Sequence, residues 1–325
     1  MAPPRLHWPA ERALRSVFMG TPEFAVPSLE ALAACTELVG VVSQPDKPRG
    51  RGRAPTPTPV AALALARGYP LIRPAKVREP EVRATLEGWR PDLLVVAAYG
   101  RILPAAMLAL PALAPINVHA SLLPRHRGAG PIAAALLAGD AQTGITIMRM
   151  TEEMDAGDIL LQHPVAIRTE DTTGNLTARL AAAGGVALRE ACARLRSGGL
   201  EAVPQDAVAV TYAPRLTKEA GRIRWTDPAV VIERKVRAFT PWPSAFTSLA
   251  GRTLKVLTAR VVGERPPPDA VPGTIIALGD VIRVATGEGA IDLLAVQAAG
   301  KRPLDVRAFL AGARLAVGTR LDASA

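Results

Sequence analysis

Short apolar runs alternate with helical patterns through the first two hundred residues of the chain. Two stretches, Pro59–Arg67 and Pro131–Ala138, begin with proline and are followed by glycine, as helices often are. Between such stretches lie apolar runs with the length and turn-forming borders of strands: 15–19, 38–43, 69–72, 92–98, 115–119 and 145–150. This alternation predicts an α/β fold, a Rossmann-like domain around a mostly parallel sheet.

The pattern changes after a long predicted helix at 173–197. Residues 198–214 lose the helical period and contain Pro204 and Pro214, which indicates a linker. Beyond it, the chain has one helical stretch and several short strand-like runs: a helix at 228–239 and strands at 221–225, 253–262, 273–278, 281–285 and 290–297. Antiparallel strands with few helices are typical of a small OB-like β-barrel, a fold often used on nucleic acid. We therefore predict domains at 1–205 and 217–325, with a linker at 206–216.

Composition and charge narrow the class of protein. No apolar run approaches the roughly 20 residues needed to span a bilayer, and residues 1–14 lack the apolar centre of a secretory signal, so we expect a cytoplasmic protein without a membrane partner. The formal charge of +10 suits a polyanionic partner, although arginine-rich composition can also reflect codon usage. Residues 206–325 carry net +6 and residues 1–205 carry net +4, so the second domain is the more basic one.

The best candidates for chemistry follow the 115–119 strand. Ligands of open α/β sheets bind beyond the carboxyl ends of strands, and Asn117 and His119 lie two apart, on the same side of such an end. An amide beside an imidazole that can be cationic suits a developing oxyanion, which predicts acyl-type transfer. Asp155, in the MDAGD loop after the next strand, could favour protonated His119 and accept a proton from an attacking amine. Asp158 of the same loop is the alternative.

Two classes of cofactor are not expected. The segment after the first strand reads GTPEF, at 20–24, where a dinucleotide-binding unit would show GxGxxG, and this argues against NAD. The histidines of the first domain show no spacing typical of zinc ligands and no cysteine nearby, so no metal site is predicted. Cys35 and Cys192 lie far apart in the sequence and suggest no disulfide framework.

Several distinctive blocks follow one another along nearly the whole chain: FMGTPEFAVPSL, SQPDKPRGRG, VVAAYGRILP, INVHASLLPRHRGAGPI, AGDAQTGITIMRM, MDAGDIL, TYAPRLTKE and RAFTPWP. In this order they resemble the methionyl-tRNA formyltransferase family. The pattern HxSLLPxxxG, from His119 to Gly128, marks the wider class of folate-dependent formyltransferases. The resemblance implies an enzyme of translation initiation that moves the formyl group of 10-formyltetrahydrofolate onto the amino group of methionyl initiator tRNA. We expect the enzyme to be a monomer.

The resemblance also implies which residues act. The catalytic triad would be Asn117, His119 and Asp155. Reduced folate would lie along two segments, with these residues: Ala98, Tyr99, Gly100, Ile102, Leu103, Ser121, Leu122, Leu123 and Pro124. The acceptor end of the tRNA would meet a basic loop in which Arg51 matches the arginine that matters most, and the second domain would bind tRNA as well. The cations concerned are Lys47, Arg49, Arg51 and Arg53 in the loop, and Lys301 and Arg302 in the second domain.

Two alternatives stay open at this point. Folate enzymes that formylate a ribonucleotide or an amino sugar, and 10-formyltetrahydrofolate dehydrogenase, share the Asn, His and Asp. The nucleotide-formylating type should lack the second domain, and the longer multifunctional proteins carry a further one. A non-catalytic nucleic-acid-binding protein, the other alternative, has no reason to keep Asn117, His119 and Asp155 together.

Overall fold

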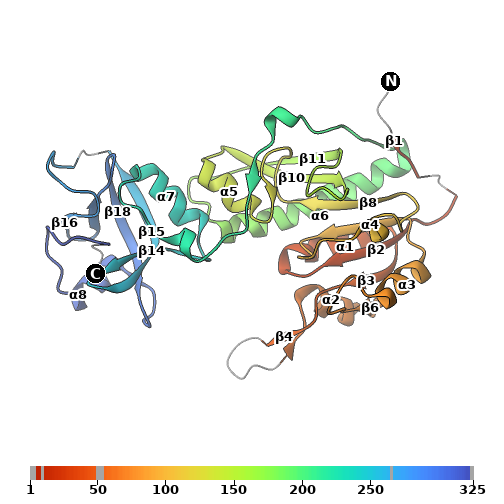
Figure 1. The fold of residues 1–325 in the computed structure, drawn as a ribbon, viewed down its shortest axis with the longest axis horizontal. Coiled ribbons are helices and arrows are strands. Elements are labelled where there is room, and N and C mark those ends of the chain that lie inside the picture. The colour runs from red at the N-terminus through yellow and green to blue at the C-terminus, as the bar shows by residue number, and fades with distance from the viewer. Residues whose placement is uncertain (1–4, 9–10, 49–54, 264–265, 323–325) are drawn as a thin grey trace. The chain divides into compact units, whose positions relative to one another are not determined.

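The computed structural model describes residues 5–8, 11–48, 55–263 and 266–322, which form two compact units (Figure 1). Unit 1 comprises Met1–Pro131, Gln142–Ala166 and Thr177–Ala213, and unit 2 comprises Ile132–Ala141, Ile167–Leu176 and Pro214–Ala325. Among the described residues, no helix combines the length and apolar character that crossing a membrane requires.

Unit 1 is built around a seven-stranded sheet. Its strands, in spatial order, are β11 (Ile159–Ala166), β10 (Gln142–Arg149), β8 (Ala114–His119), β7 (Leu93–Ala97), β2 (Arg15–Gly20), β3 (Glu37–Val42) and β6 (Leu71–Ile72). The pairs from β8 to β6 are parallel, whereas β10 runs antiparallel to both β8 and β11. The predicted α/β class with a mostly parallel sheet is confirmed. β11 was missed, because along this edge strand only part of the run is buried.

Helices cover the sheet of unit 1. They are η1 (Glu23–Ala25), α1 (Val26–Cys35), α2 (Pro59–Arg67), α3 (Pro80–Trp89), α4 (Ala105–Leu108) and, from Thr177 onward, α6 (Thr173–Ser197). The helix α5 (Pro131–Ala138) belongs to unit 2 except for its first residue. The predicted helix at 59–67 is confirmed together with its end signals. The Thr58 hydroxyl accepts from Ala61 N, and Gly68 ends the helix at φ 68°.

The two faces of the unit 1 sheet pack against different helices. On one face, Val17 and Met19 of β2 share a core with Val82 and Leu86 of α3. On the other, α6 approaches α1 so closely that a Cβ at Gly185 would lie 2.8 Å from the Pro27 carbonyl oxygen. Strands buried on both faces explain the continuous apolar runs in the sequence.

The chain that follows α6, residues 198–213, is called the connecting segment below. It contributes strands β12 (Leu200–Glu201) and β13 (Tyr212–Ala213) and the turn η2 (Ala207–Ala209). β12 pairs with β1 (Arg5–Leu6), and β13 pairs in parallel with β9 (Arg127–Gly128). The connecting segment is therefore held against unit 1 and does not run free through solvent.

Unit 2 contains an antiparallel sheet. Its elements are η3 (Glu219–Gly221), α7 (Ala229–Ala238), β14 (Ala245–Leu249), β15 (Arg252–Val262), β16 (Ile275–Leu278), β17 (Ile282–Ala285), β18 (Ala290–Ala298), β19 (Leu304–Asp305) and α8 (Val306–Gly312). The strands lie in the order β14-β15-β18-β17-β16, with β19 added to β18. Ile232 and Val236 of α7 lie in its core with Val256 of β15. The predicted antiparallel, strand-rich second region is confirmed.

The strand predicted at 221–225 is wrong. This stretch makes only an isolated bridge, from Arg222 to Phe246. Ile223 and Trp225 are both buried, so an extended chain that buries alternate side chains gives the sequence pattern of a strand without its pairing. The strand that does pair there, β14, was missed.

Candidate active site

The carboxyl end of β8 carries the two residues that the sequence singled out first. His119 is 5% exposed, and Asn117 is half-buried. The intervening Val118 is buried on the opposite side of the strand, near Gly184 of α6. Strand alternation therefore puts Asn117 and His119 on one side of the sheet, as predicted.

The imidazole of His119 is held between a carbonyl and a carboxylate. Its Nε2 lies 3.1 Å from the His126 carbonyl oxygen, and its Nδ1 lies 3.7 Å from Asp155 Oδ2. A carbonyl can only accept, so in the neutral ring Nε2 carries the proton and Nδ1 presents a lone pair. The Nδ1 atom is thus the one that faces Asp155 and can gain a proton.

Burial decides the charge of His119 at rest. It lowers the pKa of His119 below the ordinary value, although the Asp155 charge and the hydrogen bond to the His126 carbonyl both raise it. Asp155 thus favours protonated His119, as the sequence predicts, but desolvation has the larger effect on the pKa of the ring. The resting site holds a neutral base beside a carboxylate.

Asp155 reaches this site by a route that the sequence did not predict. In the antiparallel pairing of β10 with β8, Thr146 lies opposite His119 and Arg149 opposite Ile116, so β10 ends beside the start of β8. Residues 150–158 then turn back and bring the Asp155 carboxylate to His119. There Oδ2 accepts from Gly128 N at 2.8 Å, with Asp155 itself in the left-handed region at φ 52°.

The segment predicted to hold folate, Ala98–Leu103, begins directly after β7. Thr21, which follows β2, and Gln44, which follows β3, donate to the Tyr99 carbonyl oxygen at 3.0 and 2.8 Å. Gly100 has φ 81°, and a Cβ there would lie 2.7 Å from Gln44 Nε2. Three parallel strand ends thus converge on Tyr99. Sequence reasoning missed Thr21 and Gln44, although each is a polar residue just beyond an apolar strand.

The second predicted folate segment, Ser121–Pro124, is fixed to the antiparallel edge of the sheet. Thr146 of β10 donates to the Ser121 carbonyl and accepts from Leu123 N. Gln162 of β11 donates to the Leu123 carbonyl oxygen at 2.8 Å. Gln162 was missed because β11 was not predicted, and Thr146 was missed although its strand was predicted, because nothing in the sequence pairs it with the loop after β8.

The cations predicted to meet tRNA are only partly described. Lys47 belongs to strand β4 (Lys47–Pro48), which pairs with β5 (Pro55–Thr56), and Arg49, Arg51 and Arg53 lie outside the described residues. In unit 2, Lys301 and Arg302 are exposed in the turn between β18 and β19.

Two other groups of side chains bear on the chemistry. No group of three potential metal ligands occurs within the described part of the chain. Cys35, the last residue of α1, and Cys192 of α6 are free cysteines that are far apart in the sequence, and each thiol shifts the pKa of the other. The Arg196 guanidinium donates to the Cys35 carbonyl at the same place.

The architecture agrees with the protein families that the chain matches. Residues 14–192 match the family described as Formyl transferase, and residues 215–314 match Formyl transferase, C-terminal domain. Methionyl-tRNA formyltransferase of Myxococcus xanthus is 48% identical over 94% of this chain and 97% of its own length, and that of Roseiflexus sp. is 47% identical over 96% and 97%. The chain belongs to the methionyl-tRNA formyltransferase family. The resemblance drawn from the sequence blocks is confirmed.

Solved structures with low sequence identity share the fold. WlaRD, described as a sugar 3N-formyl transferase, matches with a TM-score of 0.65 at 16% identity, covering 90% of this chain and 100% of that one. HypX from Aquifex aeolicus, in a complex with tetrahydrofolic acid, matches with a TM-score of 0.57 at 17% identity. That match covers 92% of this chain but only 47% of HypX.

Proposed function

We propose that this protein transfers the formyl group of 10-formyltetrahydrofolate to the free amino group of methionyl initiator tRNA, giving the formylated tRNA used to start translation. The observation that carries the proposal is the approach of Asp155 to His119 beside Asn117, in a chain similar over its length to enzymes named for this reaction. A cytoplasmic location and a monomeric state belong to the same proposal.

The chemistry follows from the three side chains. Asn117 donates an amide N–H to the formyl oxygen as negative charge develops there during attack by the amine. His119 accepts the proton of that amine at Nδ1 as the new C–N bond forms, because its ring is neutral and Nε2 is already protonated. His119 then returns the proton to the folate nitrogen as the old C–N bond breaks.

In this scheme Asp155 stabilises the charged form of His119. Its Oδ2 faces Nδ1 at 3.7 Å, so the imidazolium that forms during the reaction lies next to a negative charge. No net proton is consumed, since the proton leaves the amine and ends on the folate nitrogen. Asp158 is the alternative to Asp155 in this role, but among the described residues the carboxylate that faces His119 is that of Asp155.

Support for a folate-type formyl donor comes from the segment after β7. Ile102 is 66% exposed while Leu103 is buried, so an apolar side chain is presented to solvent from an anchored segment. Such a surface suits a flat heterocycle, and backbone polar groups nearby can orient it. We propose that all nine residues predicted from the resemblance line the donor site, with the pterin ring against Ile102.

The remaining predictions from the sequence concern tRNA. We propose that residues 1–205 form the catalytic domain, that 206–216 link it to residues 217–325, and that this second domain binds tRNA. The exposed Lys301 and Arg302 and the net charge of +6 over residues 206–325 support this role. Within the basic loop, Arg51 is proposed to contact the acceptor end.

The test is a transfer assay with radiolabelled 10-formyltetrahydrofolate and three acceptors: charged initiator tRNA, a glycinamide ribonucleotide and a nucleotide-linked amino sugar. The expected result is label on charged tRNA, with uncharged tRNA as the control for a free amino group. Label on the ribonucleotide or the amino sugar would overturn the assignment of acceptor. An absence of transfer to any acceptor, with intact tRNA binding, would favour a non-catalytic binding protein.

A further inference from the structure

The connecting segment touches the catalytic loops at several points. Val203 exchanges backbone hydrogen bonds with Ile159, at the start of β11. The Thr211 hydroxyl accepts from His126 N at 2.8 Å, and its carbonyl accepts from Arg127 N at 2.9 Å. His126 in turn supplies the carbonyl to which His119 is bonded. Residues outside the predicted triad therefore brace the loop that follows β8.

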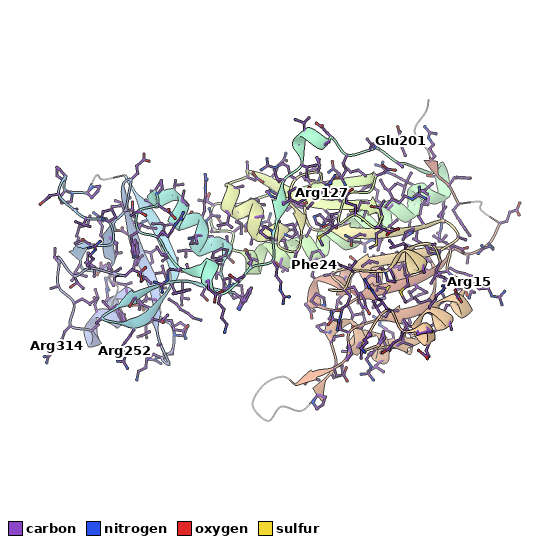
Figure 2. All side chains as sticks on the ribbon, viewed as in Figure 1. Arg15, Phe24, Arg127, Glu201, Arg252 and Arg314 are labelled. Carbon is purple, nitrogen blue, oxygen red and sulfur yellow. The ribbon has the colours of Figure 1, made fainter. Side chains whose placement is uncertain are left out.

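Within this segment, the side chain of Gln205 makes four hydrogen bonds. Its Nε2 donates to the carbonyl oxygens of Asp155 and Gly157, at 2.8 and 2.7 Å. Its Oε1 accepts from Nε and Nη2 of Arg127, at 3.1 and 3.0 Å. Both amide hydrogens and the amide oxygen are thus engaged. Arg127, labelled in Figure 2, is only 8% exposed.

We propose that Gln205 is a positioning residue for the reaction, holding the Asp155 loop so that the Asp155 carboxylate stays against His119. The proposal rests on the roles of Asp155 and His119 put forward above. Gln205 itself acts through Asp155, because its contacts are with the backbone of the loop and with Arg127, and not with His119.

The contacts form a closed ring around Asp155. The Arg127 side chain reaches the Asp155 carbonyl through Gln205, and the next residue, Gly128, donates its N–H to the Asp155 carboxylate at 2.8 Å. The backbone and the side chain of Asp155 are therefore both anchored to one dipeptide. Such double anchoring fixes the direction in which the carboxylate leaves the backbone, which a single contact would leave free to rotate.

The backbone of the Asp155 loop explains why an anchor is needed. Asp155 is in the left-handed region, at φ 52°, which residues other than glycine occupy uncommonly. Two residues on, a Cβ at Gly157 would collide with the Arg149 carbonyl oxygen, so the chain passes very close to the end of β10. Gln205 binds the carbonyls on either side of this tight turn, at Asp155 and at Gly157.

Two substitutions of Gln205 distinguish the part played by its N–H donors from the part played by its carbonyl acceptor. Gln205→Leu removes all four hydrogen bonds, whereas Gln205→Glu keeps an acceptor for Arg127 but turns a carboxylate toward two carbonyl oxygens. Small displacements of a catalytic group can cost about 100-fold in rate. We expect both variants to lower kcat by about 10- to 100-fold, with little change in KM for the formyl donor. Asp206→Ala is the matched control, because the Asp206 side chain caps η2 through Val208 N in the same segment and does not reach Asp155.

A double-mutant cycle tests whether Gln205 acts through Asp155. Once Asp155→Asn has removed the carboxylate charge, repositioning it should matter little, so Gln205→Leu should lower kcat far less in that background than in the wild type. If kcat of the double variant fell by the product of the two single losses, the two residues would act independently and the proposal would be overturned. If Gln205 had only a structural role, the losses in kcat would also multiply, and each variant's loss of kcat would parallel its fall in Tm.

A second readout needs no substrate. The ring signals of His119 can be titrated by NMR, and Asp155 raises the pKa of this ring. Displacement of the carboxylate in Gln205→Leu should therefore lower the pKa of His119, while Asp206→Ala should leave it as in the wild type. A folded Gln205 variant with wild-type kcat and titration would overturn the proposal. Failure of Asp155→Asn itself to lower kcat would instead overturn the proposed role of Asp155, so the two failures are distinguishable.

Discussion

Each unit of this protein has a nearly buried carboxylate that faces a basic side chain, but the two carboxylates have different partners. In unit 2, Asp292 of β18 is 1% exposed and accepts from Arg283 Nε at 2.8 Å and from Arg260 Nη2 at 3.2 Å. In unit 1, the Asp155 carboxylate lies 3.7 Å from His119 and accepts from a backbone N–H. Asp292 is bound by two permanent cations, whereas Asp155 faces a base that is neutral at rest.

The difference separates a carboxylate that supports structure from one suited to reaction. Burial by itself would raise the pKa of Asp292, but the hydrogen bonds from Arg283 and Arg260 hold that pKa below its usual value. Its charge is thus compensated in the folded protein whether or not a reaction is under way. The full electrostatic effect of Asp155, by contrast, appears only when His119 gains a proton, which is when a catalytic carboxylate is needed.

The largest expected effect comes from the oxyanion donor beside this pair. Asn117→Ala removes an amide that we propose stabilises charge only during the reaction, so kcat should fall by about 10²–10³ with little change in folate affinity. His119→Ala should have a loss at least as large. Steady-state kinetics with charged initiator tRNA and an equilibrium folate titration measure the two quantities separately. A folded variant with near-normal kcat would remove that residue from the proposed triad.

The next effect tests the reactive carboxylate itself. Asp155→Asn keeps the shape and removes the charge, and we expect kcat to fall by about 10². Because Asp155 raises the pKa of His119, its loss should lower that pKa further. Activity requires neutral His119 in our scheme, so the acid limb of the pH–rate profile should move to lower pH. An unmoved profile would make Asp155 a turn residue and Asp158 the next candidate.

The corresponding change in unit 2 should affect stability and leave catalysis intact. Asp292→Asn leaves Arg260 and Arg283 without the Asp292 anion, and we expect a loss of about 2–3 kcal/mol in the free energy of unfolding, with kcat near wild type.

The effect should depend on pH, because the pKa of Asp292 is lower in the folded state than in the unfolded state. The stabilisation by Asp292 is present above its pKa in the unfolded state, near 3.8, and disappears as pH falls through its pKa in the folded state. Chemical denaturation at neutral pH and at about pH 3 should therefore show a difference between variant and wild type that shrinks in acid. A large loss of kcat in this variant would erase the contrast between the two carboxylates.

The same contrast explains what the sequence could reveal. Asn117 and His119 were predictable because both belong to one strand, where a separation of two residues fixes a common side. Arg260, Asp292 and Arg283 come from three strands of unit 2, and no local pattern joins them. Most strands could be predicted from the periodicity of apolar residues. One exception is the segment at Ile223 and Trp225, which is extended and buries alternate side chains but does not pair as a strand.

Loop supports were the least predictable part of the site. Gln205 lies 50 residues from Asp155 and 78 from Arg127 in sequence, and polar residues in a linker usually face solvent. The resting charge of His119 could not be predicted from the motif, because the burial of its ring depends on the loop from Ser121 to Gly128, whose His126 carbonyl contacts the imidazole. A motif identifies which residues meet, whereas their protonation depends on how completely the rest of the chain covers them.

The smallest expected effect concerns the basic surface of unit 2. Lys301→Ala and Arg302→Ala remove exposed cations from the turn between β18 and β19. Removal of one phosphate-binding cation should reduce the slope of log K against log salt by about 0.7–0.9, so the double variant should bind tRNA more weakly than the wild type at low salt, and this difference should shrink as salt rises. Folate affinity should not change.

The Arg51→Ala variant serves as the comparison from unit 1. In this variant the turnover of charged tRNA should fall more than the affinity for tRNA. If the Lys301 and Arg302 variants kept the wild-type salt slope while Arg51→Ala reduced it, the phosphate contacts would belong to the basic loop, and the second domain would have no part in holding tRNA at this turn.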